Sequence, residues 1–204
     1  GTESSYEFIS TRELFMTKTT SPMKYDMFVM PIHDPLKPMA QCFDEDLELA
    51  VKCEQLGFAD FWVGEHHSSS YENIVMPEIF LGKVLGLTDS IRIGPAPVCL
   101  QYHNPVHVAG RLAFLDHLSH GRLNVCFGPG AVATDMEVYG IEPKDTGARV
   151  GEAIEMIMKI WSSKMIASNR NSNTPRFRYV SFVSWVNVTI AFCDFNPAKF
   201  CQSG

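Results

Sequence analysis

The sequence contains no apolar run that approaches the roughly 20 residues needed to span a bilayer. It also lacks a cluster of Lys and Arg, and its formal net charge of −6 argues against a nucleic-acid-binding surface. Residues 1–22 are polar and mixed in charge, without the basic start and apolar stretch of a signal peptide. These absences predict a cytoplasmic protein with a flexible leader over residues 1–22 and with neither membrane nor nucleic acid as a partner.

Two further patterns are missing. None of the 6 cysteines belongs to a C-x-x-C pair, which favours buried, reduced thiols over a disulfide framework. No G-x-G-x-x-G segment is followed by an acidic residue about twenty positions on, which argues against a Rossmann dinucleotide site.

What the 204 residues do contain is a repeating order of short apolar run, loop and amphipathic helix. Strands are predicted at residues 25–30, 59–63, 91–99 and 123–127. Helices are predicted from Asp44, as a possible N-cap, to Gly57, over residues 77–87, from Pro105 with Asn104 as its cap, and over residues 147–162.

The strands start at intervals of 34, 32 and 32 residues, the length of one strand plus one crossover helix. This alternation predicts a parallel sheet with helices outside, in an α/β fold. Spacing alone leaves open a doubly wound sheet or part of a (β/α)8 barrel.

The chain changes character after Ser163. Residues 1–163 carry 12 Lys and Arg against 22 Asp and Glu, whereas residues 164–204 carry 5 against 1. Residues 179–192 are β-prone but do not continue the βα spacing. We expect a half barrel over residues 23–163 and a divergent tail over residues 164–204 that forms a β-hairpin or an edge strand.

Polar residues follow the predicted strands where the carboxyl ends of parallel strands meet, which is where sites form in such folds. Four of the 7 histidines lie there: His33, His66, His67 and His103. Three interpretations remain: a metal site of Glu65, His66 and His67, acid–base chemistry by one histidine, or hydrogen bonding without chemistry. The first is disfavoured because adjacent strand residues point to opposite faces, so we predict no metal site.

Several segments together resemble the luciferase-like flavin-dependent monooxygenases, and the form Gly128-Pro129-Gly130-Ala131 is most similar to the limonene-monooxygenase branch. The resemblance covers residues 23–163. The matching segments are Gly64-Glu65-His66-His67, Asn104-Pro105-Val106, residues 115–123 (LDHLSHGRL), Gly128 to Ala131, Asp135 and Tyr139-Gly140-Ile141.

The resemblance implies a (β/α)8 TIM barrel that uses reduced FMN and oxygen to put one oxygen atom into a small apolar organic substrate. It implies catalytic roles for His66 and Glu65. It also implies cofactor binding by His67, Cys99, Leu100, Gly128, Pro129 and Gly130. A separate flavin reductase would supply the electrons.

Two departures from the family pattern matter. Pro129 stands where some members have an Arg for the FMN phosphate, and only about four of eight βα units are present, against about 250 residues in a full barrel. A half barrel leaves sheet edges open, so we expect a homo-oligomer, most simply a dimer. The alternatives are a shortened, non-catalytic flavin-binding protein or a deazaflavin-dependent oxidoreductase.

Overall fold

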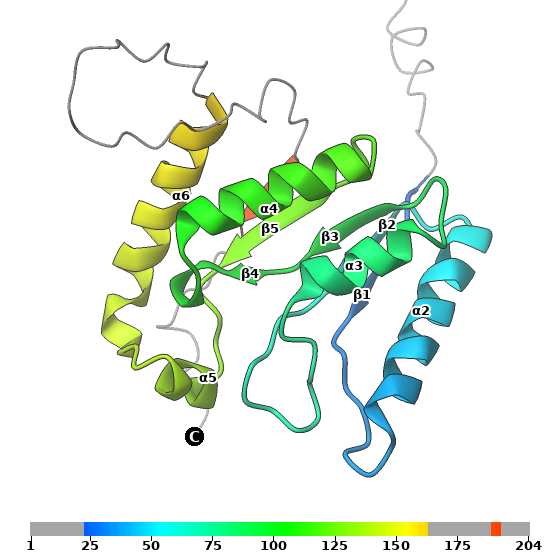
Figure 1. The fold of residues 1–204 in the computed structure, drawn as a ribbon, viewed down its shortest axis with the longest axis horizontal. Helices are drawn as coiled ribbons and strands as arrows, with labels where there is room; N and C mark the ends of the chain where they lie inside the picture. The colour runs from blue at the N-terminus through cyan, green and yellow to red at the C-terminus, as the bar shows by residue number, and fades with distance from the viewer. Residues whose placement is uncertain (1–22, 163–188, 193–204) are drawn as a thin grey trace, which may run out of the picture.

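The computed structural model describes residues 23–162 and 189–192 (Figure 1). Short strands alternate with helices along the chain, as the spacing predicts. The elements are β1 (Asp26–Val29), α2 (Met39–Gln55), β2 (Asp60–Val63), α3 (Pro77–Leu85), β3 (Arg92–Pro95), β4 (Val98–Cys99), η1 (Leu100–Tyr102), α4 (Pro105–Leu118), β5 (Asn124–Gly128), α5 (Ala133–Val138), η2 (Pro143–Asp145), α6 (Thr146–Ser162) and β6 (Thr189–Phe192).

All strand pairs are parallel, in the orders β1-β2-β3 and β4-β5-β6. A parallel bridge between Ile93 and Leu123 joins the two groups. Strands therefore lie side by side in chain order, and consecutive helices contact one another in the same order: α2 with α3, α3 with α4 and α4 with α6. This is the arrangement of one side of a (β/α)8 barrel, and it confirms the predicted fold class with only part of a barrel present.

The predicted third strand is divided in two. β3 pairs with β2 and β4 pairs with β5, and residues 96–97 separate them. Pro97 has no amide hydrogen to donate to a ladder, so an uninterrupted strand over residues 91–99 is wrong.

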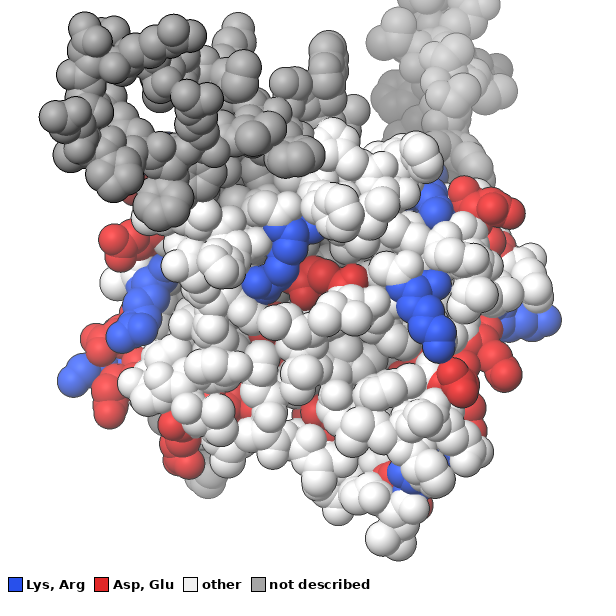
Figure 2. All heavy atoms as spheres, viewed as in Figure 1, with Lys and Arg blue, Asp and Glu red and all other residues white. Residues whose placement is uncertain are grey.

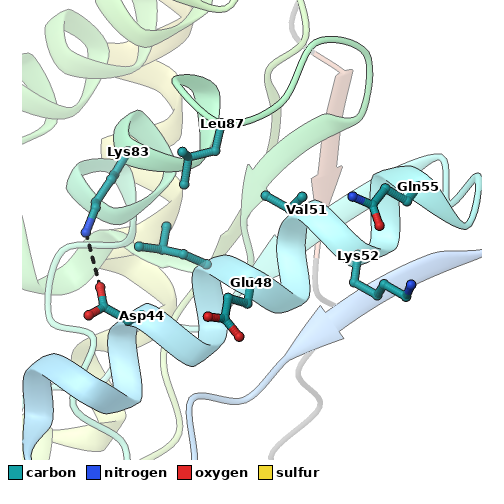
Figure 3. A pocket seen from close by; sticks show the side chains of 8 residues that line it. Asp44, Glu48, Val51, Lys52, Gln55, Lys83 and Leu87 are labelled. Carbon is teal, nitrogen blue, oxygen red and sulfur yellow. Dashed lines mark hydrogen bonds and ion pairs between the residues drawn. The ribbon is translucent and has the colours of Figure 1, made fainter.

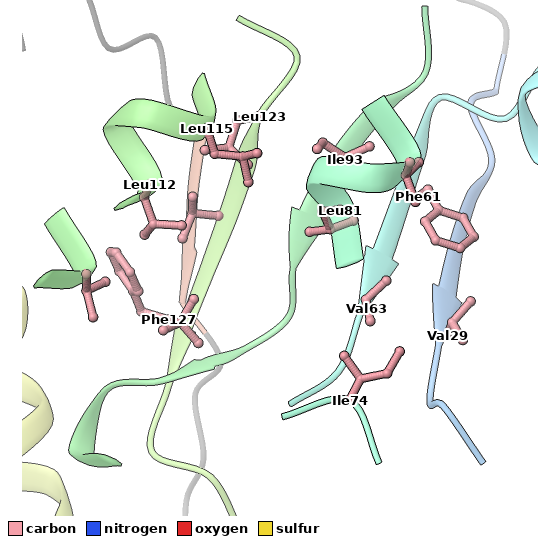
Figure 4. Close-up of a cluster of buried hydrophobic side chains, with 14 of the residues drawn as sticks. Val29, Phe61, Val63, Ile74, Leu81, Ile93, Leu112, Leu115, Leu123 and Phe127 are labelled. Atoms are coloured by element: carbon pink, nitrogen blue, oxygen red, sulfur yellow. The ribbon is translucent and has the colours of Figure 1, made fainter. Parts of the chain in front are cut away.

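The core lies between the sheet and the helices, as Figure 4 shows for its central side chains. Phe61, Val63 and Ile93 of the sheet are fully buried and belong to one cluster with Leu81 of α3 and Leu112 of α4. Burial of each such side chain contributes about 1.5–3 kcal/mol. The strands are thus held from the helix side, and their carboxyl ends are positioned by a rigid layer.

The start of α4 confirms the sequence prediction. The Asn104 side chain accepts hydrogen bonds from the amides of Val106 (2.9 Å) and His107 (3.4 Å), and Pro105 is the first helical residue.

The start of α2 corrects the prediction. The helix begins at Met39 after Pro38, so Asp44 is not its N-cap but lies inside it. Cys42 is buried, so the apolar face of the helix extends further toward the amino end than a start at Asp44 predicts.

Strand β6 is the one described part of the predicted tail. It pairs with β5 in parallel over four residues, so this part of the 164–204 segment extends the parallel order at the edge of the sheet. The predicted leader, residues 1–22, lies outside the described residues, as does the rest of the tail.

Surface and cysteine properties of the described part agree with its composition. No helix within residues 23–162 is long and apolar enough to cross a membrane. On the face shown in Figure 2, basic and acidic side chains are interspersed and no basic patch forms. Cys42, Cys53, Cys99 and Cys126 are buried thiols, whereas Cys193 and Cys201 lie outside the described residues.

Candidate functional site

The two ends of the sheet differ in chemistry. At the amino ends of the strands, Asp60 accepts hydrogen bonds from Arg92 Nε (2.5 Å) and Asn124 Nδ2 (2.9 Å). Arg122 donates to the carbonyls of Ile91 and Thr88, both at 3.1 Å. Arg122 belongs to the family-like segment 115–123, and its bonds tie together the chain ahead of β3 and β5.

At the carboxyl ends, Glu65 is the centre of a hydrogen-bond network. Its side chain is fully buried, and one oxygen, Oε1, accepts from Nε2 of both His67 and His103 at 2.6 Å. The other oxygen accepts from the Cys99 amide at 3.0 Å. Burial alone would raise the pKa of Glu65, but the bonds from His103 and His67 outweigh it and lower that pKa to about 2. The carboxylate is ionised at neutral pH, so both imidazoles carry a hydrogen on Nε2.

Two tyrosines continue this network outward. The Tyr139 hydroxyl lies 2.9 Å from Nδ1 of His67, and the Tyr139 ring stacks on Tyr102 with centroids 4.8 Å apart. Burial raises the pKa of Tyr102 to about 12, and burial together with the charges of Glu65 and Asp135 raises the pKa of Tyr139. Both phenols are neutral at physiological pH, and Tyr139, 42% exposed, forms the outer end of the chain.

His66 has different surroundings from its neighbours. Its Nδ1 is buried and makes no hydrogen bond within the described residues; Asp135 Oδ2 lies 3.5 Å away, and Glu72 Oε1 lies 3.7 Å from Nε2. Asp135, on α5, also accepts from the amides of His67 (3.1 Å) and Ser68 (2.7 Å). One buried carboxylate thereby fixes the backbone that follows His66 and also faces the buried Nδ1 of its imidazole.

His33 does not join the other rim histidines. Its Nδ1 lies 2.9 Å from Asn73 Oδ1 and its Nε2 lies 2.9 Å from Asp46 Oδ2. This contact links the loops after β1 and β2 to α2. Of the four rim histidines, only His67 and His103 converge on one group.

The proposed cofactor-contacting backbone gathers at the same edge. Cys99 pairs with Gly128 in the parallel ladder, and Gly130, with φ +69°, lies close to Cys99 and Tyr102: a Cβ at this glycine would stand 2.9 Å from the Tyr102 hydroxyl. Leu100 belongs to the buried core, and the Cys99 amide is already bonded to Glu65. The segment 128–130 thus lies at this edge beside Cys99 and Tyr102.

The donor set Glu65, His66 and His67 considered for a metal does not assemble, since His66 and His67 have different partners. Single donor atoms of Glu65, His67 and His103 do lie within 4.8 Å of one another. The 2.6 Å contacts are hydrogen-bond distances, and an ionised carboxylate between two N–H donors is satisfied as it stands. We interpret this cluster as a hydrogen-bonded network.

A groove of about 500 Å³ lies elsewhere, on the outer surface of α2 and α3 (Figure 3). An ion pair between Asp44 and Lys83 (3.4 Å) crosses it. None of the strand-end residues lines it, so it is separate from the candidate site.

Comparison with known proteins shows the family to which the chain belongs. Residues 23–185 match the family model of the luciferase-like monooxygenases. The limonene 1,2-monooxygenase of Rhodococcus erythropolis is 34% identical over 173 residues, which cover 85% of this chain and 45% of that protein.

Solved structures extend the comparison to the fold. The oxygenating constituent of 3,6-diketocamphane monooxygenase from Pseudomonas putida, solved in complex with FMN, superposes with a TM-score of 0.73 at 23% identity, covering 83% of this chain and 51% of that one. An F420-dependent secondary alcohol dehydrogenase superposes with a TM-score of 0.63 at 22% identity, covering 82% and 51%.

The fold is thus that of the α/β barrel oxidoreductases, and the candidate site lies at the carboxyl ends of its strands. The chain belongs to the luciferase-like monooxygenase family. It spans about half the length of the relatives it matches.

Sequence reasoning placed Glu65, His66 and His67 at one strand end but did not commit His103, Tyr139 or Tyr102 to the site. His103 was visible as a rim histidine, and Tyr139 as part of the Tyr-Gly-Ile segment. They converge on Glu65 and His67 because three loops approach one another in the folded chain, and no spacing in the sequence encodes that approach.

Proposed function

We propose that this protein is a flavin-dependent monooxygenase that uses reduced FMN, supplied by a separate reductase, and oxygen on a small apolar organic substrate. Family membership supports the reaction class, and the FMN complex of a protein with the same fold supports the cofactor. The observation that carries the proposal is His66: a buried imidazole nitrogen without a hydrogen bond, at the strand end where sites form in this fold.

The described residues fit a flavin in two respects. Gly130 has a backbone conformation that favours glycine, and the absence of a Cβ there lets the chain pass close to the Tyr102 hydroxyl and the Cys99 sulfur at this rim. His66 Nδ1, at the same rim, is a buried polar atom that makes no hydrogen bond within the described residues. When bound, reduced FMN would carry out the chemistry with oxygen, because that reactivity is a property of the cofactor.

The chain's own residues would then orient the ligand and handle protons. Asp135 fixes the 67–68 backbone, which sets the position of the neighbouring His66 imidazole. His66 would donate a proton to, or hold one at, an oxygen atom of the reacting ligand. Glu65 would keep His67 in place from below, as a positioning residue.

The test is a titration of the 204-residue chain with FMN, followed by protein and flavin fluorescence. Saturable binding, then substrate-dependent oxygen consumption with reduced FMN that falls by at least tenfold in His66→Ala, would support the proposal. The matched control is His107→Ala, since His107 is exposed on α4. A folded chain that does not bind FMN would refute it.

We propose in addition that two copies associate. The outer edge of β1 has no partner among the described strands, and Phe28 in this strand and Met30 and Ile32 just after it are 50%, 42% and 65% exposed. An open edge with apolar side chains favours pairing with a second copy. A solution mass of twice 22.9 kDa that falls to the single value in Phe28→Lys would support this, and a monomer at all concentrations would refute it.

One alternative cofactor has a specific observation in its favour. The F420-dependent dehydrogenase has the same fold. Absorbance and fluorescence spectra of the cofactor retained by the purified chain distinguish a deazaflavin from FMN, and retention of either without turnover would indicate a flavin-binding protein without catalysis.

A further inference from the structure

Glu65 fixes the tautomer of His67. The carboxylate accepts from Nε2, so in the neutral imidazole the second nitrogen, Nδ1, has no hydrogen and is an acceptor. That nitrogen faces the Tyr139 hydroxyl at 2.9 Å, which must then donate to it. The three groups form one directed chain, from the hydroxyl of the partly exposed Tyr139 through an imidazole to a fully buried carboxylate.

The chain has two complementary protonation states. When His67 is neutral, the Tyr139 hydroxyl donates to Nδ1. When His67 is an imidazolium, Nδ1 donates to the Tyr139 oxygen, and the hydroxyl hydrogen turns outward. The Glu65 carboxylate stabilises the imidazolium charge in the second state.

We propose that Tyr139, His67 and Glu65 form a proton relay, with the Tyr139 hydroxyl as the end that exchanges a proton with the ligand bound at the strand ends. In the forward step the Tyr139 O–H proton passes to an oxygen atom of the ligand, and the Nδ1 proton of His67 replaces it on the phenol oxygen. His67 is left neutral and regains its proton from solvent through the same hydroxyl. The identity of the ligand rests on the proposed function; the relay itself does not.

The surroundings of His67 support this assignment over a purely structural hydrogen bond. Besides Glu65 and Tyr139, the titratable side chains packed around it are His103 and Tyr102, together with Asp135, which accepts from the His67 backbone amide at 3.1 Å. His103 donates its own Nε2 hydrogen to Glu65, and the Tyr102 ring lies edge-on at 5.4 Å without a hydrogen bond to His67. Among residues 23–162, the Tyr139 hydroxyl is the group that hydrogen-bonds Nδ1 of His67. Within this part of the chain the proton path outward therefore runs through Tyr139.

Tyr102 provides the matched control. The Tyr102 ring is stacked on Tyr139, so Tyr102→Phe removes a hydroxyl from the same aromatic pair but leaves the hydrogen bond at Nδ1 of His67 in place. Tyr139→Phe and Tyr102→Phe should therefore differ if the hydroxyl of Tyr139 acts on His67, and should behave alike if only ring packing matters.

The first readout needs no cofactor. In the full chain labelled with ¹⁵N-histidine, the Nδ1 resonance of His67, assigned with His67→Asn, should report a hydrogen-bonded acceptor when the imidazole is neutral and a hydrogen-bonded donor when it is an imidazolium. Tyr139→Phe should shift that resonance toward the value of a free imidazole nitrogen and change the titration midpoint of His67, whereas Tyr102→Phe should leave both unchanged. Unchanged Nδ1 in Tyr139→Phe, or equal shifts in the two variants, would overturn the relay.

The second readout uses reduced FMN and substrate. Tyr139→Phe should slow oxygenation by about 10²-fold, within the usual range for general acid–base groups, and remove a limb of the pH–rate profile, while FMN binding is retained. A rate within twofold of the unchanged chain would overturn the relay.

A third measurement covers the case in which Tyr139→Phe does not fold. In the chain labelled with fluorotyrosine, the ¹⁹F signal of Tyr139 should follow the titration of His67 and lose that dependence in His67→Asn. A signal that does not respond to His67 would refute the relay. Failure of the unchanged chain to bind FMN would refute the proposed function alone, since the His67 and Tyr139 signals decide the relay without a cofactor.

Discussion

Replacing Glu65 by Gln tests whether the buried carboxylate holds the strand ends together through its charge. The substitution keeps the shape of the side chain but turns one oxygen into an NH₂ group. That group would face N–H donors that now meet a carboxylate, namely the imidazoles of His67 and His103 or the Cys99 amide. At least one donor would lose its acceptor.

The magnitude follows from linkage. The network lowers the pKa of Glu65 from 4.5 to about 2, and a difference of this size corresponds to about 3 kcal/mol at 1.36 kcal/mol per unit. Because the folded-state pKa is the lower one, this stabilisation is complete above about pH 4.5 and is lost as the pH falls toward 2. We expect Glu65→Gln to lower the free energy of unfolding by about 3 kcal/mol at pH 7, and the difference from the unchanged chain to shrink between about pH 4.5 and 2.

Urea unfolding followed by far-UV circular dichroism over this pH range measures both quantities. Glu142→Gln is the matched control, because Glu142 is exposed and should give no difference at any pH. A Glu65→Gln effect that stays constant from pH 7 to 2.5 would refute the reasoning, since it would show that shape, not charge, holds the network.

Three further substitutions test the geometry of the site and its supports. Gly130→Ala should destabilise the fold by about 2 kcal/mol, and by more than Gly140→Ala, because both glycines have positive φ but only the Gly130 Cβ would meet neighbouring atoms. Thermal unfolding measures both variants, and equal effects would contradict the close approach at Gly130. Asn104→Ala should cost about 1 kcal/mol by removing the α4 cap, measured by urea unfolding; no loss would show that the cap does not contribute. Asp135→Asn should cost about 1–2 kcal/mol and speed amide exchange at Ser68 with little change in the strands; protected exchange there would contradict its anchoring role.

The comparison of prediction with structure separates two kinds of residue. The segment 115–123 carried much of the family resemblance, yet Arg122 in it bonds backbone carbonyls at the amino ends of the strands, opposite the site. The family resemblance implies a catalytic role for Glu65. In the structure its buried carboxylate accepts hydrogen bonds from the imidazoles of His67 and His103. A motif identifies a family without saying which of its residues face the ligand.

The sequence alone determined the order of elements, the parallel sheet and the rim on which the site lies, because these follow from hydrophobic period, helix caps and a repeat of about 32 residues. The start of α2 and the break between β3 and β4 were missed because tertiary packing and a missing amide hydrogen decide them. Only the tertiary structure decided the partners of each histidine. His66 and His67 are neighbours in the chain, but successive side chains near a strand end point in different directions, so one meets Asp135 and the other Glu65 and Tyr139.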